Sequence, residues 1–451
     1  MFIFVLTYIT KTPFKMQTLE KGSKKLLNAW AFYDWANSVY SLVIASSIFP
    51  IYYQALFSSA GIEYISIFGG TIRSTPLITY TTAIAFVFIS ILIPILSGVA
   101  DFVGNKKVFM KFFCYLGAFS CMGLYFFNLE NILTSLFFYL LALVGFWCSW
   151  IFYNSYLPDV AYPEQQDKLS AKGFSLGYIG SVLLLLFNLA MIMIPESFGL
   201  GDDGESKMKA MQISFVSVGI WWLLFSQYTF YFLPKGKRSN NKVTWHLLFD
   251  GYRELKKVYK SLTKNKVLKR YLSAFFVYSM AVQTVMLVAT YFGEQEIDWG
   301  SENQKTIGLI SSILIIQLVA ILGAQLTSLA SGKFGNITTL IIINGIWAVL
   351  CVIAFFMTSP IQFYITAGFV GMVMGGIQAL SRSTYSKFLP KTKDTASYFS
   401  FYDVSEKIGI VIGMLIYGFI DQYTGSMRNS IVFLMLFFIV GVILLMRVPK
   451  K

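Results

Sequence analysis

Charged residues are scarce in this sequence. They make up 13% of its 451 residues, whereas soluble globular proteins carry about 25%. The apolar share is 56%, and the mean hydropathy is +0.64. Because such a chain has too few polar side chains to cover its surface in water, most soluble classes of protein are excluded. We therefore expect an integral membrane protein.

Histidine and paired cysteines are also nearly missing. The sequence has one histidine, His246, and four cysteines, which all lie in apolar runs without a CxxC pair or a Cys/His cluster. This usage fits neither a disulfide framework nor a zinc site. One histidine cannot build a histidine-based triad or a multi-histidine metal site, and no GxxxxGK[ST] nucleotide loop is present. We therefore expect no cofactor, no metal site and no enzyme activity.

Long apolar runs are abundant instead. A bilayer core about 30 Å thick is crossed by a helix of about 20 apolar residues. Runs of that length predict an all-α integral membrane protein with twelve transmembrane helices, at residues 30–54, 78–99, 107–127, 132–157, 173–194, 211–233, 271–292, 307–328, 337–358, 361–387, 398–420 and 428–447.

The longest polar interruption divides these spans into six and six. The predicted organisation is an N-terminal segment 1–29, a six-helix bundle 30–233, a basic linker 234–270 and a second six-helix bundle 271–451. The linker is expected to be solvated, with a short amphipathic helix on the lipid headgroups, and nucleic-acid binding is a remote alternative. The stretch before Met16 is either an amphipathic lead-in or lies upstream of the true initiator, Met16. We slightly favour Met16 as the initiator.

Basic residues are distributed unevenly between the two predicted sides. An even number of spans puts both termini on the side of the linker, and that side receives 31 of the 36 Lys and Arg residues. The other side has five, namely Arg73, Lys207, Lys209, Lys305 and Arg428. By the positive-inside rule, the termini and linker are cytoplasmic. A multi-pass protein of the plasma (inner) membrane is expected if the source is prokaryotic.

Two predicted turns resemble each other. The turn at 98–107 contains Phe102-Val-Gly104-Asn105, and the turn at 332–336 contains Phe334-Gly335-Asn336, at equivalent places in the two halves. Repeated bundles place a substrate site near the bilayer midplane, where the halves meet. The alternative is a coincidence of turn chemistry. The residues of the first turn that we expect to act in a cytoplasmic gate or in the structure are Gly98, Asp101, Gly104, Lys106 and Lys107.

The turn at 98–107 also resembles the cytoplasmic signature of the major facilitator superfamily, although its basic residues are lysines, which lack the planar bidentate fork of arginine. Five further segments together resemble the vacuole effluxer-like branch of that superfamily: NAWAFYDWANS at 28–38, FYNSYLPD at 152–159, KGFSLGYIG at 172–180, GGIQALSRS at 375–383 and SFYDVSEK at 400–407. The resemblance covers residues 28–447. It implies the major facilitator fold and a secondary transporter that works by alternating access, with amino acid efflux as the leading activity and proton coupling as an option.

Asp34 is the clearest charged residue inside a predicted span. Asp34, Asn37, Ser38 and Ser41 have the spacing of one helical face. A charge at the bilayer centre costs at least about 2.5–3.5 kcal/mol, so this polar stripe is a candidate for binding substrate or a coupling proton. Alternatively, Asp34 lies near the cytoplasmic end and only caps or pairs at the helix entrance.

The eleventh span carries Asp403, Glu406 and Lys407. Asp403 and Lys407 have the i,i+4 spacing of a helical ion pair, which leaves Glu406 unmatched unless Arg382 of the tenth span reaches it. These charges form either a cytoplasmic gate or a coupling carboxylate. Arg382 shares a helical face with Gln378 and Tyr385, where it either holds a substrate carboxylate or joins the charge network.

Other polar residues are lesser candidates. Asn154 and Gln283 are cavity candidates, together with Thr284 and Asn188, although single amides in spans are usually helix-to-helix contacts. Asp159 follows Pro158 at the end of the fourth span and is expected to bond to the 98–107 turn. The expected partners are a small solute, protons and the lipid bilayer, with no nucleic acid and no obligate protein partner. The alternatives are a membrane-embedded enzyme such as a lipid transferase, or a gradient-independent channel.

Overall fold

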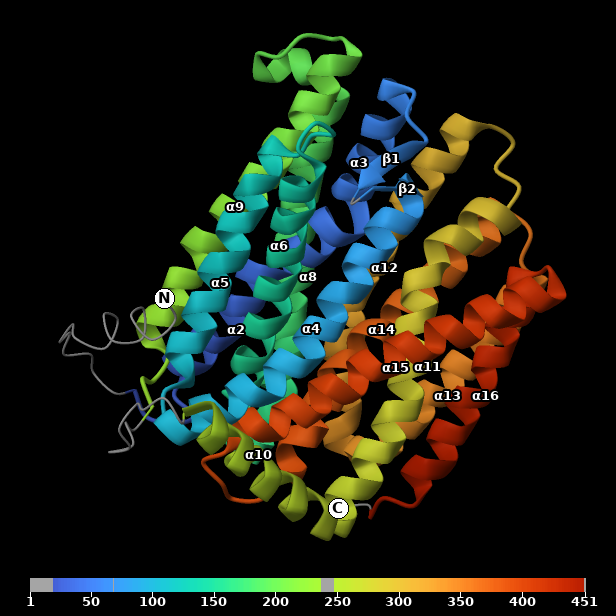
Figure 1. Ribbon diagram of the computed structural model, residues 1–451. Coiled ribbons are helices and arrows are strands. Elements are labelled where there is room, and N and C mark those ends of the chain that lie inside the picture. Colours follow the sequence, from blue (N-terminus) through green and yellow to red (C-terminus); the bar gives the residue numbers. More distant parts are fainter. Residues whose placement is uncertain (1–18, 68, 237–246, 450–451) are drawn as a thin grey trace. The chain divides into compact units, whose positions relative to one another are not determined.

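A computed structural model describes residues 19–67, 69–236 and 247–449 (Figure 1). The question of Met1 or Met16 as the initiator therefore lies outside the described residues, as do His246 and part of the linker. The elements are the helices α2 Lys24–Val39, η1 Tyr40–Ile48, α3 Phe49–Ala60, α4 Ser74–Val103, α5 Lys106–Gly123, η2 Leu124–Phe126, α6 Ile132–Ser155, α7 Leu157–Val160, α8 Pro163–Met193, η3 Pro195–Phe198, α9 Gly204–Phe232, α10 Leu247–Lys264, α11 Lys266–Glu296, α12 Glu302–Phe334, α13 Asn336–Phe356, α14 Pro360–Phe388, α15 Thr395–Thr424 and α16 Met427–Met446, and the strands β1 Tyr64–Ile67 and β2 Gly70–Arg73.

The prediction of an all-helical membrane protein is confirmed. Within the described chain, eleven helical segments are long and apolar enough to cross a membrane. The predicted eleventh span corresponds to α15, which has 30 residues. It is not among those eleven segments, and its central part carries Asp403, Glu406 and Lys407. The count of twelve thus depends on α15, whose charges must be neutralised inside the protein.

Two local features were not expected from the sequence. The loop after the first span forms a hairpin, in which Tyr64 of β1 pairs with Arg73 of β2. The first span itself is not a uniform α-helix, because its middle part, η1, is a nine-residue π-helix. The wider π turn shifts the side-chain positions that follow it, and such segments occur often at functional sites.

Contacts divide the chain into two compact units. Unit 1 consists of residues 1–156 and 180–255, and unit 2 consists of residues 157–179 and 256–451. The first part of α8 therefore belongs with the second half of the sequence. The division into bundles 30–233 and 271–451 remains a prediction, and it differs from these units at α8 and α10.

In unit 1, the long helices α5, α6 and α9 lie side by side (Figure 1). A Cβ atom on Gly145 of α6 would lie 2.4 Å from the Cα atom of Gly117 in α5, so only glycine permits this approach. Without a hydrophobic driving force between helices in lipid, such small residues are what allows close packing. Helix α9 begins where Asp203 accepts a hydrogen bond from the Ser206 backbone N–H at 2.7 Å, which lowers the pKa of this carboxyl.

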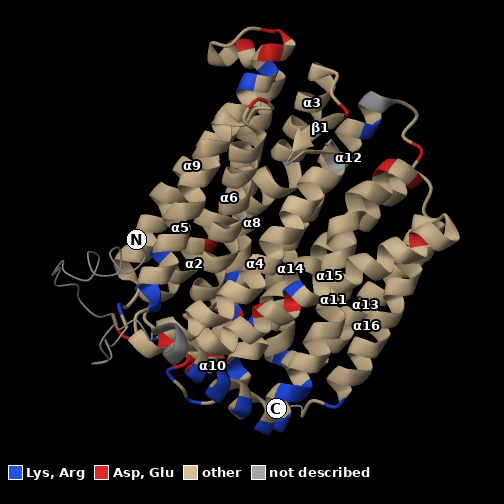
Figure 2. Cartoon of the chain, in the orientation of Figure 1, with Lys and Arg blue, Asp and Glu red and all other residues tan. Residues whose placement is uncertain are grey.

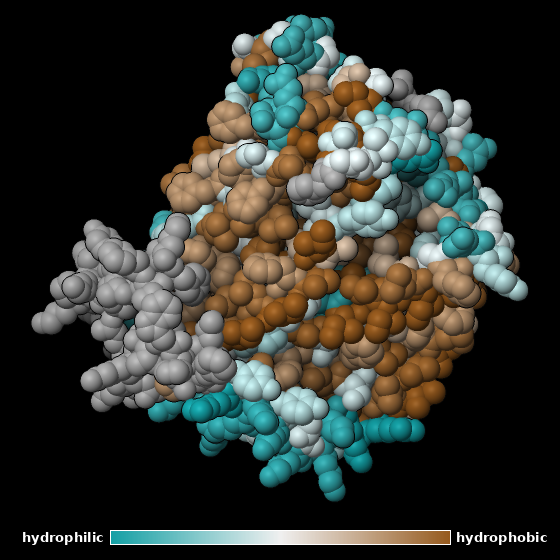
Figure 3. Space-filling model, in the orientation of Figure 1, coloured by the Kyte–Doolittle hydropathy of each residue, from teal (hydrophilic) through white to brown (hydrophobic). Residues whose placement is uncertain are grey.

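In unit 2, α12 and α14 pack backbone against backbone. A Cβ atom on Gly375 would lie 2.2 Å from the Ala320 carbonyl oxygen, and one on Gly371 would lie 2.5 Å from that of Ile316. Figure 2 shows that Lys and Arg gather in unit 2 at the end that carries α10 and the C-terminus. In Figure 3 the surface over the middle of the helices is mostly hydrophobic, whereas the surface at the end that carries α10 is hydrophilic.

The close contact at Gly375 predicts that an alanine lowers the free energy of unfolding at this position but not at Gly345. We expect Gly375→Ala to lower the free energy of unfolding by about 1–3 kcal/mol, because the added methyl group overpacks a closed contact. Gly345→Ala is the matched control, since a Cβ atom there meets nothing within 4 Å and alanine favours a helix over glycine by up to about 1 kcal/mol. Thermal unfolding of both purified variants measures these changes in stability. Equal melting temperatures would contradict the packing described here.

Candidate functional site

Asp34 is fully buried in α2 of unit 1. Its Oδ2 accepts a hydrogen bond from the Tyr153 hydroxyl at 2.7 Å. The Trp30 ring stacks on the Tyr153 ring at 4.5 Å, and Trp30 Nε1 donates to the Tyr153 carbonyl oxygen at 3.1 Å. Since Tyr153 is in the last turn of α6, which ends at Ser155, Asp34 lies level with that helix end. Asp34 is also ten residues, almost three turns, beyond the first residue of α2, Lys24, so its role at the helix entrance stays a prediction.

The rest of the polar stripe has mixed surroundings. Asn37 is fully buried, and neither atom of its amide has a hydrogen-bond partner among the described residues. Ser38 is half-buried, and Ser41 is exposed and already belongs to the π-helix η1. A buried amide without a partner is rare in folded proteins unless water or a ligand satisfies it. The Asn37 amide therefore has hydrogen-bonding capacity left for a ligand.

The turn between α4 and α5 is built as the sequence predicts, with Gly104 at a φ of 71°. Its two lysines are buried. Lys106 Nζ donates to the Ser155 carbonyl oxygen at the end of α6, at 2.7 Å, and Lys107 Nζ donates to that of Leu233 after α9, at 2.5 Å. Carbonyl groups at helix C-termini lack partners within the helix and favour a nearby positive charge. These lysines therefore hold together helix ends of unit 1.

Two other residues of this turn region had predicted roles. A Cβ atom on Gly98 would lie 2.2 Å from the Gly251 carbonyl oxygen, so Gly98 allows the start of α10 to contact the end of α4. Asp101 is half-buried in the last turn of α4. Asp159 is exposed in α7, and its expected bond to this turn stays a prediction. Asn154 is buried in the last turn of α6.

Unit 2 contains a buried charge cluster on α15. Lys407 Nζ lies 3.0 Å from Asp403 Oδ1, which confirms the predicted ion pair. The same Nζ lies 3.3 Å from Glu406 Oε2, and Gln283 of α11 donates its amide to Glu406 Oε1 at 2.8 Å. The expectation that pairing leaves Glu406 unmatched is therefore wrong, because one lysine contacts both acids. The structure also brings the candidate Gln283 to this cluster.

Arg382 is also buried, but its bonds connect two helices of unit 2. Its Nε donates to Ser170 Oγ at 2.9 Å and its Nη2 to the Ser170 carbonyl oxygen at 3.1 Å, while its guanidinium lies 4.3 Å from the centre of the Phe174 ring. Gln378, one turn away, accepts a hydrogen bond from the Tyr178 hydroxyl at 2.9 Å. These contacts tie α14 to α8 and use two of the five N–H donors of the guanidinium.

A second polar network lies where α8, α12, α13 and α14 meet. Asp167 Oδ2 lies 2.5 Å from Lys387 Nζ and accepts a hydrogen bond from Ser331 Oγ at 3.2 Å. Asp167 Oδ1 accepts one from the Asn336 amide at 3.0 Å. Sequence reasoning missed these residues, because it started the fifth span near residue 173 and left Asp167 in a loop. Asn336 was noticed only as part of the repeated turn, which was the one available signal.

The remaining candidate chemistry is limited. No group of three or more His, Cys, Asp or Glu side chains that could hold a metal ion occurs in the described ranges. The four cysteines are free and buried.

Comparison with known proteins identifies relatives along nearly the whole chain. A family model described as vacuole effluxer Atg22 like matches residues 22–451. An uncharacterized MFS-type transporter YxiO of Bacillus subtilis (strain 168) is 32% identical over 439 residues, 96% of each chain. Autophagy-related protein 22 of Saccharomyces cerevisiae (strain ATCC 204508 / S288c) is 21% identical over 491 residues, 92% of this chain and 90% of the yeast protein.

Solved structures support the same fold. The MFS proton:xylose symporter XylE has a TM-score of 0.70 at 13% identity, with 94% of this chain and 96% of that chain covered. The E. coli fucose:proton symporter FucP has a TM-score of 0.66 at 16% identity, with 95% and 98% covered. At such identities the likeness shows the fold alone.

The fold and the relatives together define a membrane transporter of small solutes, of the major facilitator type. They leave no support for the membrane-enzyme alternative, because these relatives are transporters. The chain belongs to the Atg22-like vacuole effluxer family.

The contacts of Asp167 with Lys387, Ser331 and Asn336, here called the Asp167 network, are predicted to stabilise the packing of α8 in unit 2. Loss of a charge-assisted hydrogen bond costs about 1.5–3 kcal/mol. We therefore expect Asp167→Asn to raise maleimide labelling of a cysteine placed at the buried Ala171 by about tenfold or more, since about 1.4 kcal/mol corresponds to a tenfold equilibrium shift. The buried native cysteines keep the background low.

Asp202→Asn, at an exposed residue before α9, is the control variant for this labelling. Equal labelling rates in the Asp167→Asn and Asp202→Asn proteins would show that the Asp167 network does not hold α8 in place.

Proposed function

We propose that this protein exports amino acids across the plasma membrane by alternating access. The observation that carries the proposal is the position of the first part of α8. This segment comes from the first half of the sequence and is bound within unit 2 by polar contacts, which can break and re-form more readily than a packed apolar seam. The name of the family, which refers to a vacuole effluxer, supports export as the direction.

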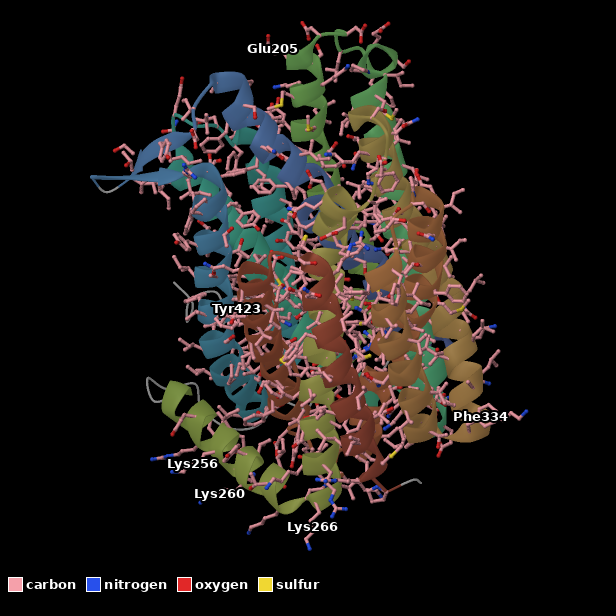
Figure 4. All side chains as sticks on the ribbon, turned by 90° about the vertical axis from the view of Figure 1, so that its right-hand side faces the viewer. Glu205, Lys256, Lys260, Lys266, Phe334 and Tyr423 are labelled. Atoms are coloured by element: carbon pink, nitrogen blue, oxygen red, sulfur yellow. The ribbon has the colours of Figure 1, made fainter. Side chains whose placement is uncertain are left out.

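The contacts of α8 serve as the gate of the cytoplasmic side in this proposal. Asp167 with Lys387, and Ser170 with Arg382, join α8 to the end of α14 that lies toward α10 and the C-terminus, and Ser331 joins Asp167 to the same end of α12. The strong excess of Lys and Arg on the predicted linker side supports a cytoplasmic position for that end. In Figure 4, Lys256, Lys260 and Lys266 project from that end of unit 2, away from the helices.

The solute site that we propose uses amides and hydroxyl groups. In unit 1, Asn37 and Ser38 offer donors and acceptors that suit a small zwitterion, and the Asn37 amide has no hydrogen-bond partner among the described residues. Arg382 is assigned to the gate and not to the solute, because Ser170 already occupies two of its donors. Asp34 remains a candidate for coupling, with a role at the helix entrance as the alternative.

The test is transport in liposomes that contain the purified protein. With a labelled mixture of the standard amino acids as the probe, we expect saturable uptake that is accelerated by unlabelled amino acids on the opposite side. This counterflow arises because a carrier must return through its alternating states, whereas a channel need not. Saturable counterflow supports the proposal.

Two results would overturn it. Flux that rises linearly with concentration without counterflow would identify a gradient-independent channel. Absence of transport for all amino acids in the mixture, with a folded protein, would exclude amino acids as the cargo.

A further inference from the structure

The buried cluster on α15 holds more negative than positive charge. Asp403 and Glu406 are two acids, and Lys407 is the one base in hydrogen-bonding contact with both. The side chains of Asp403 and Lys407 are 3% and 1% exposed, whereas that of Glu406 is 15% exposed. If all three are ionised, the two acids share Lys407 as their ion-pair partner, and two like charges held close together in an apolar span are costly.

The surrounding helices contribute few charges to this cluster. Tyr278 of α11 and Tyr402 of α15 lie close enough to interact electrostatically with Glu406, and Tyr402 also interacts with Arg382 of α14 and Tyr271 of α11. Tyr278 is hydrogen-bonded to Ser381 at 2.7 Å. Arg382 directs its Nε and Nη2 to Ser170 of α8. The described contacts of the cluster itself therefore come from Lys407 and from the uncharged amide of Gln283.

One carboxylate oxygen in this cluster has no hydrogen-bond partner among the described residues. Oδ2 of Asp403 is buried and has no hydrogen-bond partner in the described part of the chain, while its Oδ1 contacts Lys407. A buried acceptor without a partner costs about 1–3 kcal/mol, or more when it is charged. A metal ion would need several further oxygen ligands, and no group of three metal-binding side chains occurs here among the described residues. A proton needs only this one oxygen.

We propose that Asp403 binds the coupling proton, and that Lys407 changes its main partner between Asp403 and Glu406 as this proton binds and leaves. When the proton forms an O–H bond at Asp403 Oδ2, Lys407 and Glu406 remain as a neutral pair. When the proton leaves to water, Asp403 regains its charge and draws Lys407 away from Glu406. Since Gln283 of α11 holds the other oxygen of Glu406, the exchange changes the contact between α15 and α11.

The proposal rests on the proposed transport function and is tested in the same liposomes, with the labelled amino acid mixture as the probe. Asp403→Asn resembles the protonated form and keeps Lys407 paired with Glu406, so it is expected to fold. We expect this variant to lose accumulation driven by a pH gradient and to retain counterflow. Asp202→Asn, at an exposed residue outside the spans, is the control and is expected to keep both activities.

Asp34→Asn is measured alongside, because Asp34 is the other buried acid considered for coupling. Wild-type accumulation in the Asp403→Asn protein would overturn the proposal, as would a loss of driven accumulation in Asp34→Asn with none in Asp403→Asn. If the wild-type protein showed no counterflow at all, the proposed function would fail instead.

Should Asp403→Asn not fold, Asp403→Glu provides the second measurement. The longer side chain alters the distance to Lys407, so we expect the pH profile of driven transport to shift relative to the wild-type protein while counterflow persists. An unshifted pH profile would overturn the proposal.

Discussion

The cost of an unpaired charge in an apolar environment governs the polar structure of this protein. The buried charges of Asp403 and Lys407 are paired with each other, and the half-buried charges of Asp167 and Lys387 form a second pair. Lys106 binds a carbonyl group at a helix end. Because lipid offers no hydrogen bonds, these partners must come from the protein itself. The charges that the apolar sequence retains are therefore the points where its helices are joined.

Two kinds of helix contact follow from this constraint. Glycine contacts, such as Gly375 of α14 against Ala320 of α12, bring backbones together and leave no room for change. The polar contacts of α8, through Asp167 and Ser170, can exchange partners with water when the helices separate. A transporter needs both kinds, since rigid groups of helices must move against one another as units. The distribution in unit 2 suits such a division.

Much of the fold could be predicted from the sequence, because apolar runs and the asymmetry of basic residues are local properties. The pair of Asp403 and Lys407 was also predictable, since both residues are one turn apart on one helix. The contact of Gln283 with Glu406 and the partners of Asp167 could not be predicted, because they join different helices and depend on how those helices pack. The π-helix η1 gave no signal in composition. Arg382 was noticed as an intramembrane charge, but only packing shows that Ser170 is its partner.

Infrared difference spectroscopy of the protein in lipid measures most directly whether a buried acid of this cluster carries a proton. The account predicts a carboxylic acid C=O band that changes as the pH is raised, that is missing in Asp403→Asn, and that persists in Asp34→Asn. A band that persists in Asp403→Asn would contradict the account, because the proton that balances the cluster would then reside on another group.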